Sequence, residues 1–158
     1  MQANPIIELR NIKKSYDMGE ECFWALNGID LDIKENDYMA IVGSSGSGKS
    51  TLMNLLGCLD YPTEGDYKLK DLNIANLSEN ELAKIRNQEI GFIFQNFNLL
   101  PRATAIQNVM QPLIYQGLSK SKRLKLASDA LEKVGLNDRM KHLPNQLSGG
   151  QRQRVATA

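Results

Sequence analysis

The sequence has no long hydrophobic run. Its longest apolar stretches, around residues 39–42 and 52–59, are far shorter than the roughly 20 residues that a membrane-spanning helix needs. The first residues, Met1–Pro5, also lack the basic and then apolar pattern of a secretion signal. These two absences argue against a membrane-spanning or secreted chain, and we expect a cytosolic compartment.

The sequence also has few cysteines, a single histidine and almost no net charge. The only cysteines are Cys22 and Cys58, too few for a disulfide framework or a thiolate metal cluster. His142 is the only histidine. A formal net charge of +1 gives no global case for nucleic-acid binding. The composition, with 42% hydrophobic and 23% charged residues in 158, is that of an ordinary globular chain.

One glycine-rich stretch stands out against this background. A glycine, four residues and then Gly-Lys-Ser match the spacing of a phosphate-binding loop. The preceding run, Tyr38–Val42, predicts a buried parallel strand, and the following run, Thr51–Leu56, predicts a helix. Glycines let backbone N–H groups point inward, and a helix N-terminus adds positive potential. The candidate phosphate-binding residues are Gly43, Ser44, Ser45, Gly46, Ser47, Gly48, Lys49, Ser50 and Thr51.

This loop predicts a nucleoside triphosphate site that also takes Mg²⁺. Lys49 would reach the β- and γ-phosphates, and the Ser50 hydroxyl would bind the metal ion. A serine-rich surface loop that binds nothing is the alternative. A linker would not place Lys-Ser at a helix start directly after a buried strand, so the phosphate site is favoured.

Strand and helix patterns surround the loop. Period-two alternation predicts strands at Ile6–Ile12 and from Phe23 through Ile33, with a shorter one at Tyr67–Leu69. The apolar run Ile90–Phe94 is also rich in β-forming residues. We therefore expect an α/β fold, with an antiparallel β layer preceding a parallel core sheet.

The helices are marked by their caps and apolar faces. Capping boxes at Ser78–Glu81 and Thr104–Gln107 each predict a helix start. The expected apolar face of a later helix consists of Leu124, Ala127, Leu131 and Val134, with Gly135 as its cap. A basic cluster opens that helix, formed by Lys120, Lys122, Arg123 and Lys125. A solvated face explains this cluster better than a lipid or nucleic-acid patch.

A second chemically distinctive stretch is Leu147–Gln151. Ser148 and Gln151 have the spacing of a capping box. The adjacent Gly149 and Gly150 are poor helix formers that a cap does not require, but they allow an anion to approach the helix N-terminus closely. One triphosphate needs only one cradle, so this second site would serve a nucleotide held by another copy of the domain.

Taken in order, the phosphate loop, Gln95 after an apolar run and Leu147–Gln151 resemble the ATP-binding-cassette (ABC) ATPases over essentially the whole chain. The resemblance implies a P-loop NTPase fold with an α-helical subdomain. It also implies that Ser148, Gly149 and Gly150 contact the γ-phosphate of ATP on the opposing copy of a head-to-tail dimer.

The same resemblance implies roles for two further residues. Gln95 would contact Mg²⁺ and the attacking water, and would relay nucleotide state to a membrane partner. Tyr16 matches the aromatic residue that stacks on adenine, although a strand-end surface tyrosine remains the alternative. The implied division is a core portion over residues 1–94, a mainly helical subdomain over 95–147 and the start of the signature helix over 148–158.

Two stretches, Glu21–Ile29 and Leu52–Asp60, are most similar to the lipoprotein-releasing, macrolide-export and antimicrobial-peptide-export ATPases. That resemblance implies two copies of a permease partner and a place on the cytoplasmic face of the inner membrane. Asn96–Thr104 would face the permease. The apolar residues Phe97, Leu99 and Leu100 suit either a docking patch or packing between the two lobes.

The family's pattern continues beyond Ala158. No apolar run followed by Asp-Glu occurs after the signature, and this element holds the general base. We therefore expect a cassette whose core is incomplete, whose central apolar edge is exposed, and which binds ATP but hydrolyses it poorly. Two alternatives stay open: a soluble ABC-type ATPase acting on ribosomes or DNA, and a non-catalytic nucleotide-binding fragment.

Overall fold

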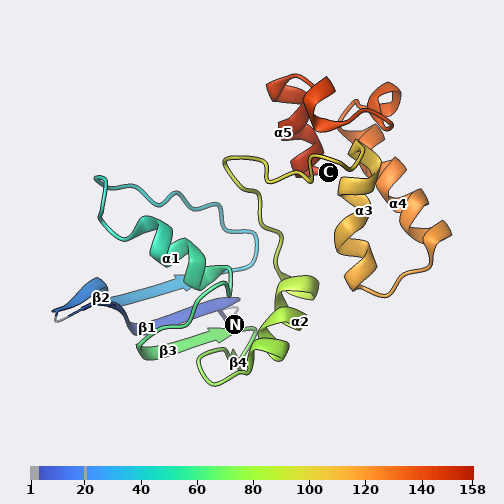
Figure 1. The fold of residues 1–158 in the computed structure, drawn as a ribbon. Coiled ribbons are helices and arrows are strands. Elements are labelled where there is room, and N and C mark those ends of the chain that lie inside the picture. The colour runs from blue at the N-terminus through green and yellow to red at the C-terminus, as the bar shows by residue number, and fades with distance from the viewer. Residues whose placement is uncertain (1–3, 20) are drawn as a thin grey trace. The chain divides into compact units, whose positions relative to one another are not determined.

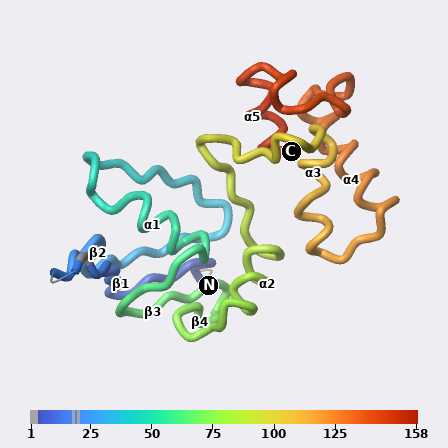
Figure 2. Tube along the Cα trace, in the orientation of Figure 1, coloured from blue at the N-terminus to red at the C-terminus, as the bar shows by residue number. Residues whose placement is uncertain are grey.

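The computed structural model describes residues 4–19 and 21–158. The chain divides into two compact units, residues 1–86 and 87–158, and each is described by itself. Figures 1 and 2 show strands mainly in the first unit and helices in the second. In the described part of the chain, no helix is long and apolar enough to cross a membrane.

The first unit is built on an antiparallel sheet with strand order β2-β1-β3-β4. A long hairpin of β1 (Ile7–Met18) and β2 (Glu21–Ile33) provides most of it. The shorter strands β3 (Glu64–Leu69) and β4 (Leu72–Asn73) extend the sheet beside β1. The antiparallel β layer expected from the alternating pattern is confirmed, and both hairpin strands are longer than predicted.

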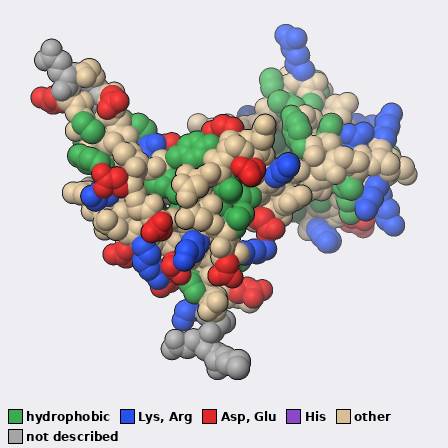
Figure 3. Space-filling model, turned by 90° about the horizontal axis from the view of Figure 1, so that it is seen from below, with side chains coloured by type: hydrophobic (Ala, Val, Ile, Leu, Met, Phe, Trp, Pro, Cys, Tyr) green, Lys and Arg blue, Asp and Glu red, His purple; other side chains and the backbone are tan. Residues whose placement is uncertain are grey.

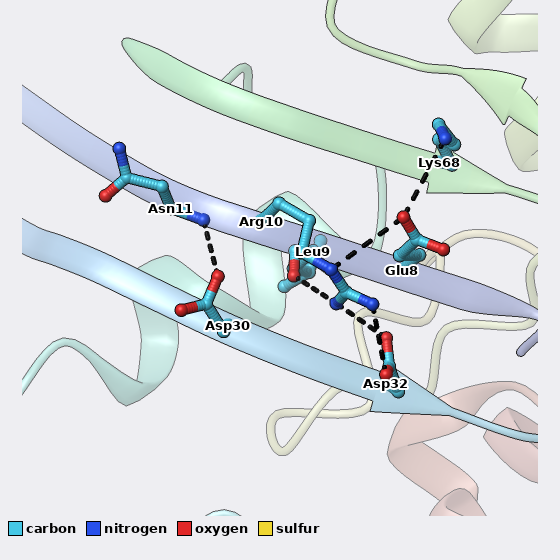
Figure 4. A network of polar contacts seen from close by, with 7 residues as sticks. All are labelled: Glu8, Leu9, Arg10, Asn11, Asp30, Asp32 and Lys68. Atoms are coloured by element: carbon cyan, nitrogen blue, oxygen red, sulfur yellow. Dashed lines mark hydrogen bonds and ion pairs between the residues drawn. The ribbon is translucent and has the colours of Figure 1, made fainter.

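Polar side chains cover one face of this sheet (Figure 4). Arg10 makes two hydrogen bonds to the Asp32 carboxylate, at 2.7 and 3.1 Å, and Glu8 lies 3.8 Å from Arg10 and 3.7 Å from Lys68. These groups are exposed or half-exposed, so water screens each pair and it contributes little to stability. Leu9, between Glu8 and Arg10, is fully buried because successive side chains alternate between faces.

The buried face carries the helix that follows the glycine-rich loop. Figure 1 shows α1 (Lys49–Leu56) lying across the sheet, where Leu52 and Leu55 are buried. Tyr67 of β3 is 1% exposed, and its hydroxyl donates to the Leu56 carbonyl at 3.0 Å. This bond satisfies one of the carbonyls that a helix end leaves unpaired. Burial raises the pKa of Tyr67 above its usual value.

The expected capping boxes are present. Ser78 precedes α2 (Glu79–Glu89), and its backbone N–H donates to Glu81 at 2.8 Å. Thr104 caps α3 (Ala105–Tyr115) and bonds reciprocally with Gln107. Both predictions are confirmed.

The second unit is a small helical bundle. Its core consists of α3, α4 (Lys120–Lys133), α5 (Gly149–Thr157) and two short 3₁₀ turns, Asn137–Arg139 and Pro144–Gln146. The buried residues are Ala105, Val109, Ala127, Leu131, Leu136, Leu147 and Val155. Gly135 follows α4 with φ +69°, as a helix-ending glycine should. Leu124, expected on the apolar face, is instead 49% exposed, so that prediction is wrong.

Neither the predicted parallel strand nor the second apolar run, which is rich in β-forming residues, forms a strand in the described residues. Tyr38–Val42 and Ile90–Phe94 have no strand assignment, and Tyr38 and Val42 are 100% and 86% exposed. A parallel strand needs a hydrogen-bonded neighbour and a covered face. The described sheet ends at β2 and β4, so neither run has a pairing partner there. Several apolar side chains of the two runs, among them Met39, Ile93 and Phe94, are also exposed.

We predict that Gly65→Ala destabilises the first unit. Gly65 has φ +98°, and an added Cβ would lie 2.4 Å from the Asn11 carbonyl oxygen and 2.6 Å from that of Arg10. Strain and collision together should lower the free energy of unfolding by roughly 2–4 kcal/mol. Urea titration followed by fluorescence of Trp24, the only tryptophan, measures this change in the sheet itself.

Gly91→Ala is the matched control, because its φ is ordinary and an added Cβ meets nothing within 4 Å. It should change stability by less than about 0.5 kcal/mol. Equal effects of the two substitutions would show that the contact between β1 and β3 at Gly65 is not tight.

Candidate functional site

The predicted phosphate loop wraps around the start of α1. Gly48 caps the helix with φ +85°, and its carbonyl accepts the first helical bond from Leu52 N–H at 2.8 Å. Gly46 also has a left-handed φ of +80°. Only glycine adopts such angles at low cost. The backbone therefore curls as a phosphate cradle requires, with the helix N-terminus at its end.

Lys49 crosses the loop. Its Nζ donates to the Ser44 carbonyl oxygen at 2.5 Å and to Ser47 Oγ at 3.3 Å. The ammonium is thus held over the curl by loop oxygens. An incoming phosphate could replace these two oxygens as its acceptor, so the loop and its lysine fit a polyphosphate chain.

The loop is seated tightly on β2. A Cβ added to Gly48 would lie 2.5 Å from the Ala25 carbonyl oxygen and 2.8 Å from a Leu26 methyl carbon. Leu26 is buried. Since backbone cannot yield as a flexible side chain does, Gly48 has to be glycine for packing as well as for its φ. The β layer therefore sets the position of the loop.

A cavity of about 460 Å³ lies between the loop and the hairpin. Its walls are Tyr16, Phe23, Ala25 and the loop residues Ser45–Thr51. Tyr16 and Phe23 are direct partners in the antiparallel register, so both rings share one face of the hairpin. An aromatic wall facing a phosphate cradle is the arrangement that a nucleotide needs for its base and its phosphates.

Sequence reasoning singled out Tyr16 and missed Phe23. The signal was present in the hairpin register, because a residue facing Tyr16 across two antiparallel strands lies on the same face of the sheet. The strand lengths and the turn had to be known to read that register.

The signature stretch forms a capped helix start in the second unit. Ser148 N–H donates to Gln151 Oε1 at 2.8 Å, and Gln151 N–H donates to Ser148 Oγ at 3.3 Å. Gly149 and Gly150 have no left-handed φ, and an added Cβ would meet nothing closer than Arg154 at 4.0 Å. Neither conformation nor packing in the described residues requires glycine at these positions.

Gln95 lies in an exposed turn of the second unit. The chain just after it is strained, since Phe97 and Asn98 have φ of +61° and +49°. The Arg152 guanidinium of α5 lies 5.7 Å from the Phe97 ring centroid, within the range of a cation–π contact. The structure thus brings the segment after Gln95 next to the signature helix.

A groove of about 370 Å³ in the second unit is lined partly by this segment. Phe97, Leu99 and Leu100 face residues of α3 and α5 across it. Leu99 packs against the helical core, whereas Leu100 is exposed. The segment is therefore anchored within its own unit and still presents apolar surface.

The basic cluster that opens α4 lies on the surface. Lys120, Lys122 and Lys125 are exposed, and Figure 3 shows blue Lys and Arg side chains standing out over the second unit. Exposed lysines at the start of a helix are typical of a solvated helix face.

The loop, the aromatic wall and the capped Gly-Gly helix are features expected of a nucleotide-binding domain of the ABC type. The chain belongs to the ABC transporter family, whose sequence pattern matches residues 26–158. The fold agrees: a solved dimeric structure of the ATP-binding cassette MJ0796, described as a post-hydrolysis state bound to ADP and Pi, has a TM-score of 0.86 and 47% identity. That match covers 95% of this chain and 66% of the other.

Curated relatives agree over nearly the whole chain. It is 56% identical to the uncharacterized ABC transporter ATP-binding protein YknY of Bacillus subtilis, over 97% of this chain and 66% of that protein. It is 54% identical to the macrolide export ATP-binding/permease protein MacB of Rhodopirellula baltica, again over 97% of this chain but only 23% of that protein. The 158 residues thus span less than two thirds of these relatives.

We predict that Gly48→Ala destabilises the first unit more than Gly46→Ala. Both glycines are left-handed, but a Cβ at Gly46 meets nothing within 4 Å, whereas one at Gly48 meets β2. Gly46→Ala should cost about 1 kcal/mol from strain alone, and Gly48→Ala roughly 2–4 kcal/mol. Urea unfolding followed through Trp24 fluorescence compares the two, and equal losses would contradict a loop seated on β2.

Proposed function

We propose that this chain binds Mg-ATP as the nucleotide-binding subunit of an ABC transporter. One observation carries the proposal: a single cavity joins the phosphate loop to an aromatic wall formed by Tyr16 and Phe23. The loop would supply backbone N–H groups and an ammonium for the phosphates, and the wall would supply ring surface for adenine. Family membership supports the choice of ATP.

Within this site, the residues have separate tasks. Gly43–Thr51 would bind the phosphates, with Lys49 already placed over the curl by Ser44 and Ser47. The Ser50 hydroxyl, at the first turn of α1, would hold Mg²⁺ together with Gln95. Bound there, the metal ion would offset the charge that develops on the phosphate oxygens.

We further propose that the signature completes the site of a second copy. Ser148, Gly149, Gly150 and Gln151 would contact the γ-phosphate of ATP bound to the opposing subunit. The exposed Gly-Gly pair, which nothing in its own unit requires, supports an approach from outside. The dimeric form described for the solved cassettes supports it as well.

The membrane partner belongs to the same proposal. Hydrolysis would drive a permease, in two copies, that exports or extracts a lipoprotein, peptide or drug at the cytoplasmic face of the inner membrane. Support comes from the relatives named as ATP-binding/permease proteins. The groove beside Phe97 and Leu100 supplies apolar surface for docking.

These 158 residues by themselves should hydrolyse ATP slowly. Gln95 can orient a water through its amide, but an amide does not accept the proton that a carboxylate general base would take. No apolar run ending in Asp-Glu is present in the sequence. ATP binding and ATP turnover are therefore separable properties of the chain.

We predict that Lys49→Ala removes most of the ATP affinity. Loss of a charged contact to phosphate should weaken binding at least about tenfold. Titration calorimetry with Mg-ATP measures it, with Lys34→Ala as control because Lys34 is exposed and lies outside the cavity. Unchanged affinity in Lys49→Ala would refute the proposed site. Phosphate release by the unaltered chain at ordinary cassette rates would contradict the predicted slow hydrolysis, but not the proposed binding site.

We predict that Gly149→Ala leaves ATP affinity intact and abolishes ATP-dependent dimerisation. The added methyl meets nothing within its own chain and should even favour the helix by about 1 kcal/mol. It would, however, occupy the space into which a partner's phosphate must fit. Sedimentation velocity with and without Mg-ATP tests this, with Gln153→Ala on an exposed position of the same helix as control. A dimer that survives Gly149→Ala would argue against the shared site.

A further inference from the structure

We propose that Asp60 is a positioning residue for the base of the bound nucleotide, acting by fixing the Tyr16 ring at the cavity wall with Lys14. The inference rests on the proposed function, because it concerns the base half of the same site. The presence of Tyr16 in the wall says nothing about what holds its ring, and the contacts behind that ring supply the answer.

Both oxygens of the Asp60 carboxylate are engaged. Oδ2 accepts a hydrogen bond from the Tyr16 hydroxyl at 3.0 Å. Oδ1 accepts from Lys14 Nζ at 2.6 Å and from the Tyr61 backbone N–H at 2.7 Å. The Asp60 side chain is 26% exposed. The carboxylate therefore joins a cation and a phenol while its own backbone neighbour fixes its orientation.

Lys14 lies close to the Tyr16 ring as well as to the Asp60 carboxylate. Its Nζ lies 5.1 Å from the Tyr16 ring centroid, and it also donates to the Tyr61 carbonyl at 2.8 Å. Its side chain is only 12% exposed. Tyr16 lines the cavity, whereas Lys14 and Asp60 do not. We therefore expect these two residues to affect a ligand through the tyrosine rather than by direct contact.

Anchoring matters because Tyr16 is half-exposed near the end of a hairpin strand. A free ring would rotate about its side-chain torsions, and ordering it on binding would cost conformational entropy. A bond at the far end of the ring, together with a nearby ammonium, fixes the plane on which a base would stack. The site is preorganised for stacking.

The anchor is rigid because it belongs to the segment that ends α1. Cys58 is fully buried with φ +52°, and its carbonyl accepts from Arg86 at 2.6 Å. Leu59 N–H bonds back to the Asn54 carbonyl at 2.9 Å. The same helix begins in the phosphate loop, so the two ends of α1 place the phosphate cradle and the anchor of the base-binding ring.

The ionised state of Asp60 agrees with this role. Burial acts to raise the pKa of its carboxyl, but hydrogen bonds from Lys14, the Tyr61 backbone and Tyr16 hold it below its usual value. Burial and the hydrogen bond to Asp60 raise the pKa of Tyr16. At neutral pH the phenol thus remains protonated and able to donate.

The test compares two ligands that differ in the base. Mg-ATP reports on the whole site, and Mg-tripolyphosphate reports on the phosphate loop without a base. Asp60→Asn preserves size but removes the charge that pairs with Lys14. We expect it to weaken ATP binding by roughly fivefold and to leave tripolyphosphate affinity unchanged. Equal weakening of both ligands would overturn the inference, because it would show a general effect on the loop.

A double-mutant cycle shows whether the effect passes through the ring. Tyr16→Ala should weaken ATP binding by about tenfold or more, and adding Asp60→Asn to it should cost nothing further. A full additional loss would show that Asp60 acts by another route. Glu64→Gln is the matched control: Glu64 pairs with Lys13 at 2.7 Å, and Lys13 lies 5.9 Å from the Trp24 ring, but none of them lines the cavity.

The outcomes also separate this inference from the proposed function. If the unaltered chain binds tripolyphosphate and ATP equally well, the loop works but the ring does not, and the positioning role fails alone. If it binds neither ligand, the proposed function fails and the inference fails with it. Melting temperatures of all variants should lie within a few degrees of one another, which excludes unfolding as the cause of a lost affinity.

Discussion

The contact on which the nucleotide site depends is the close approach of Gly48 to β2. At this point the loop backbone lies so near the Ala25 carbonyl that a single methyl group would collide with it. The antiparallel hairpin therefore determines where the loop lies. It sets the height of the phosphate cradle above the sheet, and through the Tyr16–Phe23 register it sets the aromatic wall facing that cradle. One strand pair positions both halves of the cavity.

Helix α1 connects the phosphate loop to the segment that contains Asp60. Its N-terminus is the cradle, while its C-terminal carbonyl at Leu56 is held by Tyr67 of β3. Beyond that end, Asp60 reaches back to the hydroxyl of Tyr16. The helix is thus fixed at both ends to the same sheet. Because rigid elements position functional groups more precisely than loops do, this short helix can hold the proposed base site and the proposed phosphate site in register.

Local signals in the sequence were sufficient for the features that depend on few residues. Capping at Ser78, Thr104 and Ser148, the alternating hairpin and the glycine-rich loop all involve neighbours close along the chain. The parallel strand expected at one apolar run, and the β structure suggested at a second, did not form for the opposite reason. A parallel strand is defined by partners distant in sequence, and within the described residues Tyr38–Val42 and Ile90–Phe94 have none. Phe23 was missed because its place beside Tyr16 follows from the strand register, and Asp60 was missed because Lys14 and Tyr16, which it contacts, are distant from it in sequence.

Two pairs of glycines in this chain differ in whether the fold itself requires glycine at those positions. Gly46 and Gly48 have backbone angles that only glycine adopts readily, and Gly48 also has a neighbour that excludes a side chain. Folding explains them. Gly149 and Gly150 have helical geometry and open space, and in an exposed helix start alanine would be the more stable residue. Glycines that lower helix stability, and that no contact within the chain requires, indicate a requirement outside the chain. The phosphate that we propose for this helix N-terminus, brought close to its backbone, would be such a requirement.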